Sequence, residues 1–166
     1  MGQLLHHNFE PVWDENSKVL ILGTFPSVKS RGHFYYHHPQ NRFWPLMARL
    51  TGHSLPETIE DKKQMLLMSG IAIWDVISSC EIDGSSDASI RSVTPNGIAS
   101  LLRKTKIEAV FCNGGKAKEL FDRYISKDSP LTAIALPSTS PANAAYSMDR
   151  LYENWKIILD FIGDKK

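Results

Sequence analysis

Cysteine is scarce in this chain of 166 residues, since only Cys80 and Cys112 occur. Two thiols cannot supply the ligands of a four-cysteine iron–sulfur cluster or of an all-cysteine zinc site. Long hydrophobic runs are also missing, because no run approaches the roughly 18 apolar residues of a membrane span. The amino terminus lacks the basic flank and the apolar run of a secretory signal. We therefore expect a cytoplasmic protein, nucleoid-associated or otherwise intracellular, with no membrane partner.

Acidic residues are missing from two stretches of the chain. No Asp or Glu lies in residues 16–56, which carry five lysines and arginines, and no charged residue at all lies in residues 129–148. The net charge is only +1, which excludes the global basic coat of proteins that bind nucleic acid without specificity. The acid-free stretches instead indicate a local surface that an anionic partner approaches. Chance and burial are the alternative explanation, above all for the second stretch.

Apolar runs and helical patterns alternate along the chain. Four runs have the composition of buried parallel strands, namely residues 18–23, 71–77, 107–112 and 131–136. Helical patterns cover residues 42–50, 57–68, 96–104, 115–125 and 147–162. Residues 80–94, rich in Ser, Asp and Gly, are predicted to form a long loop. The order predicts one α/β domain over residues 1–166, a three-layer sandwich with a central four-stranded parallel sheet and helices on both faces.

In such a sheet, ligands bind beyond the C-terminal ends of the strands. The segments that follow those ends are residues 23–41, 78–94, 113–116 and 137–143. Two of these segments fall within the acid-free stretches. Topology and charge therefore argue independently for the same edge of the sheet.

The first segment opens with a turn that is suited to close contact with a ligand. It consists of Gly23, Thr24, Phe25, Pro26 and Ser27. Glycine permits close approach of the backbone, and proline fixes the turn, so main-chain groups can face a ligand. An ordinary strand-to-loop turn is the alternative.

Aromatic and histidine residues are concentrated in residues 33–44, around the start of the first predicted helix. Exposed rings with interleaved cationic side chains suit stacking on bases and contact with phosphates. His33, His37 and His38 suggest a metal site as an alternative, although zinc needs three or four ligands in a definite geometry and no carboxylate lies nearby in the sequence. A loop whose rings pack on the core, with Asn41 as a helix N-cap, is a further alternative.

The segment after the last predicted strand, residues 136–143, offers hydroxyl and amide groups and no acid. Such groups are suited to gripping phosphate, and a turn that caps the final helix is the alternative. Ser138 is a poor candidate for a hydrolase nucleophile, because it lacks a nucleophile elbow and no His follows it in the chain.

Two charged residues lie close to predicted strand ends. Lys116 follows Asn113 and two glycines at the start of a predicted helix, where an anion could bind, although the P-loop pattern is absent. Asp75 is either a catalytic carboxylate or an organiser of the adjacent loop, and the second interpretation is favoured.

Together, the turn at residues 23–27, the segment at 36–44 and the Pro137–Ser138 turn resemble motifs of the uracil-DNA glycosylase superfamily, in the same order. The similarity is greatest to the hypoxanthine-DNA (deoxyinosine) glycosylase branch, with its Gly-x-Phe-Pro-Ser and Leu-Pro-Ser-Thr-Ser-Pro-Ala-Asn motifs. This chain has Phe25 where uracil-excising members have Asn or Asp, and Leu136 where the best-known of them have His. Both departures argue against strong uracil excision.

The resemblance implies a monofunctional DNA repair glycosylase that flips a deaminated base, expected to be hypoxanthine, and hydrolyses its N-glycosidic bond to leave an abasic site. It implies that Asn41 is catalytic, either by orienting the attacking water or by donating to the leaving base. We expect a monomer that needs no metal and no cofactor. Its expected partner is DNA containing a deaminated base. Residues expected to bind the base are Gly23, Thr24, Phe25, Pro26, Ser27 and Tyr36. Residues expected to contact DNA are Arg42, Lys116, Pro137, Ser138, Thr139, Ser140, Pro141, Ala142 and Asn143.

Three alternatives stay open at this point. The first is a uracil or mispaired-thymine DNA glycosylase of the same fold. The second is a damaged-DNA binding module that has lost catalysis. The third is a metal-dependent hydrolase that uses the three histidines.

Overall fold

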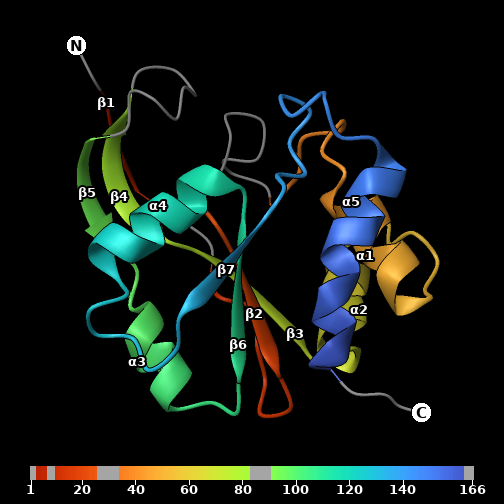
Figure 1. Ribbon diagram of the computed structural model, residues 1–166, viewed down its shortest axis with the longest axis horizontal. Helices are drawn as coiled ribbons and strands as arrows, with labels where there is room; N and C mark the ends of the chain where they lie inside the picture. Colours follow the sequence, from red (N-terminus) through yellow and green to blue (C-terminus); the bar gives the residue numbers. More distant parts are fainter. Residues whose placement is uncertain (1–2, 7–9, 26–33, 83–90, 163–166) are drawn as a thin grey trace.

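The computed structural model describes residues 3–6, 10–25, 34–82 and 91–162. At its centre lies a four-stranded parallel sheet with the order β3-β2-β6-β7 (Figure 1). Its strands are β2 (Val19–Gly23), β3 (Ile71–Asp75), β6 (Ala109–Asn113) and β7 (Ala133–Leu136). The four strands predicted from the apolar runs are therefore confirmed, with shorter bounds.

Helices cover both faces of this sheet, as expected for a three-layer sandwich (Figure 1). One face carries α1 (Phe43–Thr51), α2 (Ile59–Met68) and α5 (Met148–Trp155). The other carries α3 (Ile98–Arg103) and α4 (Gly115–Tyr124). Side chains of β2 alternate between the two layers, because Ile21 packs with the first group of helices and Leu20 with the second. A strand buried on both faces must be apolar throughout, which explains the sequence of β2.

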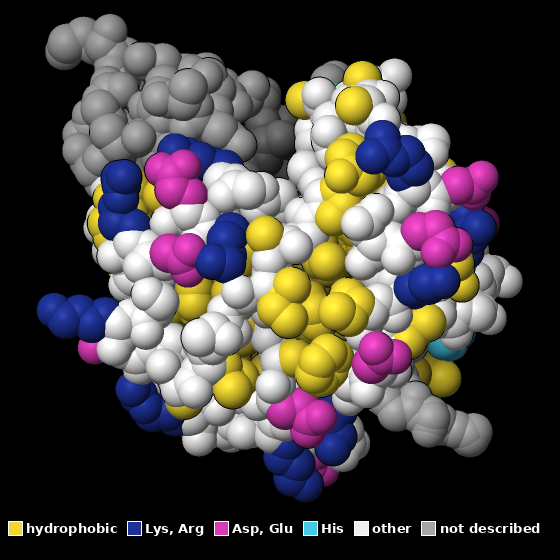
Figure 2. Space-filling model, viewed as in Figure 1, with side chains coloured by type: hydrophobic (Ala, Val, Ile, Leu, Met, Phe, Trp, Pro, Cys, Tyr) yellow, Lys and Arg dark blue, Asp and Glu magenta, His cyan; other side chains and the backbone are white. Residues whose placement is uncertain are grey.

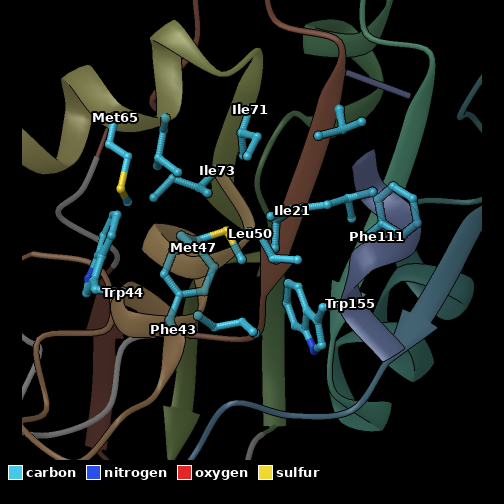
Figure 3. Close-up of a cluster of buried hydrophobic side chains, with 14 of the residues drawn as sticks. Ile21, Phe43, Trp44, Met47, Leu50, Met65, Ile71, Ile73, Phe111 and Trp155 are labelled. Atoms are coloured by element: carbon cyan, nitrogen blue, oxygen red, sulfur yellow. The ribbon is translucent and has the colours of Figure 1, made fainter. Parts of the chain in front are cut away.

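Aromatic side chains fill the core between α1, α5 and the sheet (Figure 3). Phe43, Phe111 and Trp155 are fully buried, and each such burial contributes about 1.5–3 kcal/mol. The ring of Phe43 meets that of Trp155 edge to face, with centroids 6.3 Å apart. Trp155 Nε1 also donates to the carbonyl oxygen of Pro137 at 2.8 Å. The core thereby fixes the segment that follows β7.

Strand β7 is the edge of the sheet and differs from the prediction of a buried strand. Ile134 is 40% exposed, and only Leu136 is buried among its four residues. Figure 2 shows hydrophobic side chains gathered along the middle of this face, over β7 and between α4 and α5. An edge strand pairs on one side only, and here the two flanking helices leave part of its outer face exposed.

The predicted loop over residues 80–94 is wrong at both of its ends. Strands β1 (Gln3–His6), β4 (Ile77–Ile82) and β5 (Arg91–Pro95) form a separate antiparallel sheet with the order β1-β4-β5. Polar residues can form strands there because backbone pairing does not require apolar side chains. Residues 83–90 lie outside the described residues.

The last predicted helix, residues 147–162, is shorter than expected. Its α-helical part, α5, is followed by a 3₁₀ turn, Lys156–Asp160. Within the described parts of the chain, every helix is too short or too polar to span a bilayer.

Candidate active site

Polar side chains meet at the carboxyl edge of the parallel sheet. Gly23 at the end of β2 pairs with Asp75 at the end of β3, and Asn113 at the end of β6 pairs with Leu136 at the end of β7. The segments that follow β2, β6 and β7 also meet there through Asn41, Asn113 and Thr139. The structure therefore brings together three of the segments chosen from the strand ends.

Gly23 lies where two side chains approach the backbone too closely for any larger residue. A Cβ atom at this position would lie 2.4 Å from Asp75 Oδ1 and 2.9 Å from the Tyr36 hydroxyl oxygen. Asp75 is only 4% exposed. The carboxylate and the phenol therefore converge on Gly23, and glycine is required by the space between them.

The carbonyl groups after β2 are already used within the fold. The carbonyl oxygen of Gly23 accepts from Val76 N at 2.8 Å, and that of Thr24 accepts from Ile77 N at 3.1 Å. Phe25 packs against the core beneath α3 and α4. Pro26 and Ser27, also predicted to bind the base, lie outside the described residues. The sequence predicted main-chain contacts here, and the N–H group of Thr24 is the better candidate.

Tyr36 adopts an uncommon conformation for a non-glycine residue. Its φ of 54° is left-handed, which costs about 1–2 kcal/mol. Its ring stacks on Phe43 with centroids 4.1 Å apart and an interplanar angle of 22°. Its buried hydroxyl has no hydrogen-bond partner among the described residues. Strain and an unpaired buried donor together are typical of a functional position.

The Tyr36 phenol is held in its neutral, donating form. Burial raises its pKa far above the ordinary value, and the negative charge of Asp75 raises the pKa further. The neighbouring Asn113 side chain lowers the pKa of Tyr36 by a smaller amount. The hydroxyl therefore stays protonated at neutral pH.

Asn41 lies two residues before the start of α1, and its carboxamide oxygen accepts two hydrogen bonds. Phe43 N donates to Asn41 Oδ1 at 2.9 Å, and the Thr139 hydroxyl donates to it at 2.8 Å. Asn41 is not the N-cap predicted as the alternative, because Arg42 holds that position, but it binds Phe43 N in the first turn of the helix. The Nδ2 hydrogens of Asn41 have no acceptor among the described residues. Asn41 therefore presents free donors and an occupied acceptor.

Thr139 was predicted to contact DNA, but its side chain points inward. The residue is fully buried. Its hydroxyl accepts from Asn113 Nδ2 at 3.0 Å, and its backbone N donates to Asn113 Oδ1 at 3.0 Å. A buried hydroxyl with two partners has no surface for a phosphate, so this prediction is corrected. The sequence placed Asn113 in the segment after β6 but gave its side chain no role, although a polar side chain at the end of a buried strand is the signal for one.

Arg42 was also predicted to contact DNA, and its guanidinium instead clamps the segment after β7. Its Nη2 donates to the carbonyl oxygens of Ser140 at 2.8 Å and Asn143 at 3.0 Å. Its Nη1 donates to the carbonyl oxygen of Tyr146. These contacts direct the guanidinium to the backbone, so Arg42 shapes the segment.

Two serines of this segment retain free donors. The Ser138 hydroxyl oxygen accepts from Ser140 N at 3.0 Å, and the Ser140 hydroxyl oxygen accepts from Ala142 N at 3.1 Å. Neither hydroxyl donates to another of the described residues. Asn143 Nδ2 holds the loop by donating to the Ser138 carbonyl oxygen at 3.0 Å.

These groups surround a hollow of about 700 Å³ at the start of α4. Its lining includes Ser138, Ser140, Gly115 and Pro137. Lys116 is the next residue of α4, and its ammonium lies 3.7 Å from Glu119. Pro141 is half-buried and Ala142 exposed, so both lie near the surface of this segment. Hydroxyl donors, the helix N-terminus and one lysine together favour an anion.

The three histidines do not form a visible cluster. His37 is exposed, and His38 Nδ1 accepts from Gln40 N at 3.0 Å. His33 lies outside the described residues. In the portion of the chain that is described, no group of three metal-ligating side chains comes together.

Comparisons with known proteins agree on one family. The model of the uracil DNA glycosylase superfamily matches residues 10–161. A protein of Methanosarcina acetivorans named hypoxanthine DNA glycosylase is 33% identical over 162 residues, which cover 93% of this chain and 98% of that protein. One of the same name from Methanosarcina barkeri is 34% identical over 114 residues, covering 67% and 72%.

A solved structure supports the same relationship. The solution structure of a Methanosarcina acetivorans protein, described provisionally as a uracil DNA glycosylase, matches with a TM-score of 0.79 and 31% identity. The match covers 94% of this chain and 96% of that one. With a family model that spans nearly the whole chain and relatives above 30% identity, this protein belongs to the uracil DNA glycosylase superfamily.

Proposed function

We propose that this protein is a DNA glycosylase that excises hypoxanthine from DNA. Membership of the superfamily supports glycosidic cleavage in DNA, and two relatives named hypoxanthine DNA glycosylase support the choice of base. The observation that carries the proposal is the Asn41 carboxamide. Its oxygen is held by two donors, and its amide hydrogens are left free at the carboxyl edge of the sheet.

The reaction breaks the bond between C1′ of the sugar and N9 of the base. The bonding electron pair leaves with the base, so the sugar gains oxocarbenium character and the purine becomes negative. Water adds to C1′, and its proton passes to the departing purine anion, which yields an abasic site and free neutral hypoxanthine. A donor placed where this negative charge develops accelerates cleavage more than it strengthens substrate binding. Asn41 Nδ2 is the proposed donor.

The base would reach this donor by leaving the duplex. Flipping costs a few kcal/mol and is least costly for a mispaired base, which favours deaminated purines. Tyr36 then offers a ring already fixed by Phe43. The N–H group of Thr24 is proposed to read the edge of the base.

The proposed contacts with DNA phosphates lie on the segment after β7 and at the start of α4. The free hydroxyl hydrogens of Ser138 and Ser140 and the ammonium of Lys116 can contact phosphates, whereas Arg42 and Asn143 hold the loop from within. Asn41, Tyr36 and Thr139, which surround the proposed reaction centre, supply no amine for a Schiff base, so we propose a monofunctional hydrolase.

A cleavage assay tests the proposal directly. Duplexes carrying one deoxyinosine, one uracil or one mispaired thymine are incubated with the protein in EDTA and then treated with alkali, which breaks strands at abasic sites. We expect breaks at deoxyinosine, and none with the Asn41→Ala variant. Breaks at uracil or thymine alone would favour a pyrimidine-specific enzyme of this fold. Tight binding of damaged DNA without breaks would favour a binding module, and activity only without EDTA would favour a metal-dependent hydrolase.

A further inference from the structure

Three side chains form a continuous chain of hydrogen bonds behind the proposed reaction centre. Asn113 Nδ2 donates to Thr139 Oγ1 at 3.0 Å, and Thr139 Oγ1 donates to Asn41 Oδ1 at 2.8 Å. The three residues come from the end of β6, the segment after β7 and the residue pair before α1. Each is therefore delivered to this point by a different part of the fold.

The direction of these hydrogen bonds is fixed by two backbone N–H groups. A backbone N–H can only donate, so the atom of Asn113 that faces Thr139 N must be its oxygen, and its nitrogen must face the Thr139 hydroxyl. In the same way, Phe43 N requires the oxygen of Asn41. The Thr139 hydroxyl has one hydrogen and already accepts from Asn113, so it gives that hydrogen to Asn41.

This arrangement excludes the opposite orientation of the Asn41 carboxamide. Rotation by half a turn would set the Asn41 NH₂ group against two donors, Phe43 N–H and the Thr139 hydroxyl. Because Thr139 is fully buried, water cannot replace a lost partner at this point. The Asn41 nitrogen is thus kept on the open side of the residue.

On the basis of the proposed glycosylase reaction, we propose that Thr139 and Asn113 are positioning residues that hold Asn41 as a donor to the leaving base. The Asn41 oxygen is already saturated by Phe43 and Thr139, so it is not the group that orients the attacking water. Thr139 is fully buried, so its hydroxyl acts on the base only through Asn41. They act by keeping the donor of Asn41 aimed at the site before the base arrives.

The first test removes only the Thr139 hydroxyl hydrogen bonds. Thr139→Val keeps the shape of the side chain, and Thr139→Ser keeps the hydroxyl. Thr105→Val is the control for loss of a threonine hydroxyl elsewhere, because the half-buried Thr105 hydroxyl donates to the backbone carbonyl oxygen of Leu102, away from the proposed reaction centre. We expect Thr139→Val to lower the single-turnover excision rate about tenfold, which corresponds to about 1.4 kcal/mol, with Kd for the DNA within about twofold. Thr139→Ser should restore most of that rate, and Thr105→Val should match the wild type.

The second test reverses the hydrogen bonds without removing a side chain. In Asn113→Asp, the ionised carboxylate still accepts from Thr139 N but also competes for the hydrogen of the Thr139 hydroxyl, so Asn41 loses that donor. When protonated at low pH, the introduced carboxyl can donate again. We therefore expect the excision rate of Asn113→Asp, relative to the wild type at each pH, to rise as pH falls. Burial and the charge of Asp75 should raise the pKa of this carboxyl above the ordinary range.

Several results would overturn the inference. They are a Thr139→Val rate equal to the wild type, a Thr139→Ser rate as low as that of Thr139→Val, a loss confined to Kd, or a ratio for Asn113→Asp that does not change with pH. Thermal unfolding is measured for each variant, and if Thr139→Val does not fold, the pH ratio of Asn113→Asp decides. Failure of the wild type to cut the deoxyinosine duplex would instead refute the proposed function, independently of any variant.

Discussion

The two ends of the parallel sheet carry hollows of nearly equal size and very different construction. The hollow at the carboxyl end measures about 700 Å³, and one at the amino end, lined by Asp14, Lys18 and Gln64 among others, about 730 Å³. At the carboxyl end, hydrogen bonds join side chains 26 and 98 positions apart. At the amino end, Asp14 bonds to residues two and three positions away. The volume of a hollow therefore does not identify a functional site. Hydrogen bonds between side chains that are far apart in the sequence identify it better.

The largest expected difference between the two ends is in catalysis. Asn41→Ala removes the proposed donor to the leaving base, and loss of one such donor lowers rates by about 10²–10³. Gln64→Ala is the matched change in the amino-end hollow and should leave the excision rate within about twofold. Single-turnover excision of deoxyinosine measures both. Equal rates for the two variants would remove the functional distinction between the ends.

The next difference concerns the free energy of unfolding. Gly23→Ala places a methyl group 2.4 Å from Asp75 Oδ1, and overpacking of this kind costs about 1–3 kcal/mol. Gly70→Ala at the amino end meets nothing closer than Lys18 Cγ at 3.7 Å, so its cost of about 1 kcal/mol comes from its φ of +80° alone. Urea unfolding of the two variants measures the difference. Because the carboxyl end is crowded, Gly23→Ala should lose more free energy of unfolding than Gly70→Ala.

Alkaline pH should lower the free energy of unfolding through a buried thiol near the carboxyl end of the sheet. Burial raises the pKa of Cys112, the residue before Asn113, from 9.0 to about 12. Because the folded pKa is the higher one, this stabilisation is complete below pH 9 and is lost as pH rises toward 12. We expect the free energy of unfolding to fall by about 1 kcal/mol between pH 9 and 10 through this thiol.

Cys112→Ala isolates that contribution. Its own cavity lowers stability by an amount that does not depend on pH, so only the slope is diagnostic. Chemical unfolding at pH 8, 9 and 10 should give a shallower decline for the variant. Above pH 10, the buried phenols of Tyr35 and Tyr36, whose pKa values are also raised by burial, should steepen the decline in both proteins. Parallel curves for wild type and variant would exclude the thiol as the cause.

The smallest expected difference is in the salt dependence of DNA binding. Lys116→Ala should reduce the slope of log K against log salt by about 1, since each phosphate contact releases about one counterion. Lys18→Ala at the amino end should leave the slope unchanged. The wild-type slope should be modest, given a net charge of +1. Fluorescence anisotropy at several salt concentrations measures all three, and a steep wild-type slope would contradict the localised grip.

The sequence predicts the framework of this fold better than the orientation of its site residues. Strand β2 was recognisable because a strand covered on both faces must be apolar. Strands β4 and β5 were not, because their pairing depends on backbone groups that every residue has. The composition of the segment after β7 indicated phosphate contacts, yet Thr139 and Arg42 turn inward. Their partners lie 26 to 104 positions away in the sequence, and no local pattern encodes such contacts.

Arg42 and Asn41 have a consequence for the order in which the protein gains its properties. The carbonyl groups that Arg42 binds lie 98, 101 and 104 positions further along the chain. During synthesis, the ribosome must therefore add most of the protein before Arg42 meets these carbonyl groups or Asn41 meets Thr139. Long-range contacts of this kind form late because closing the intervening loop costs entropy. In a nascent or partly unfolded chain, these side chains are therefore not yet positioned. The capacity to cut bases from DNA is confined to molecules that have finished folding.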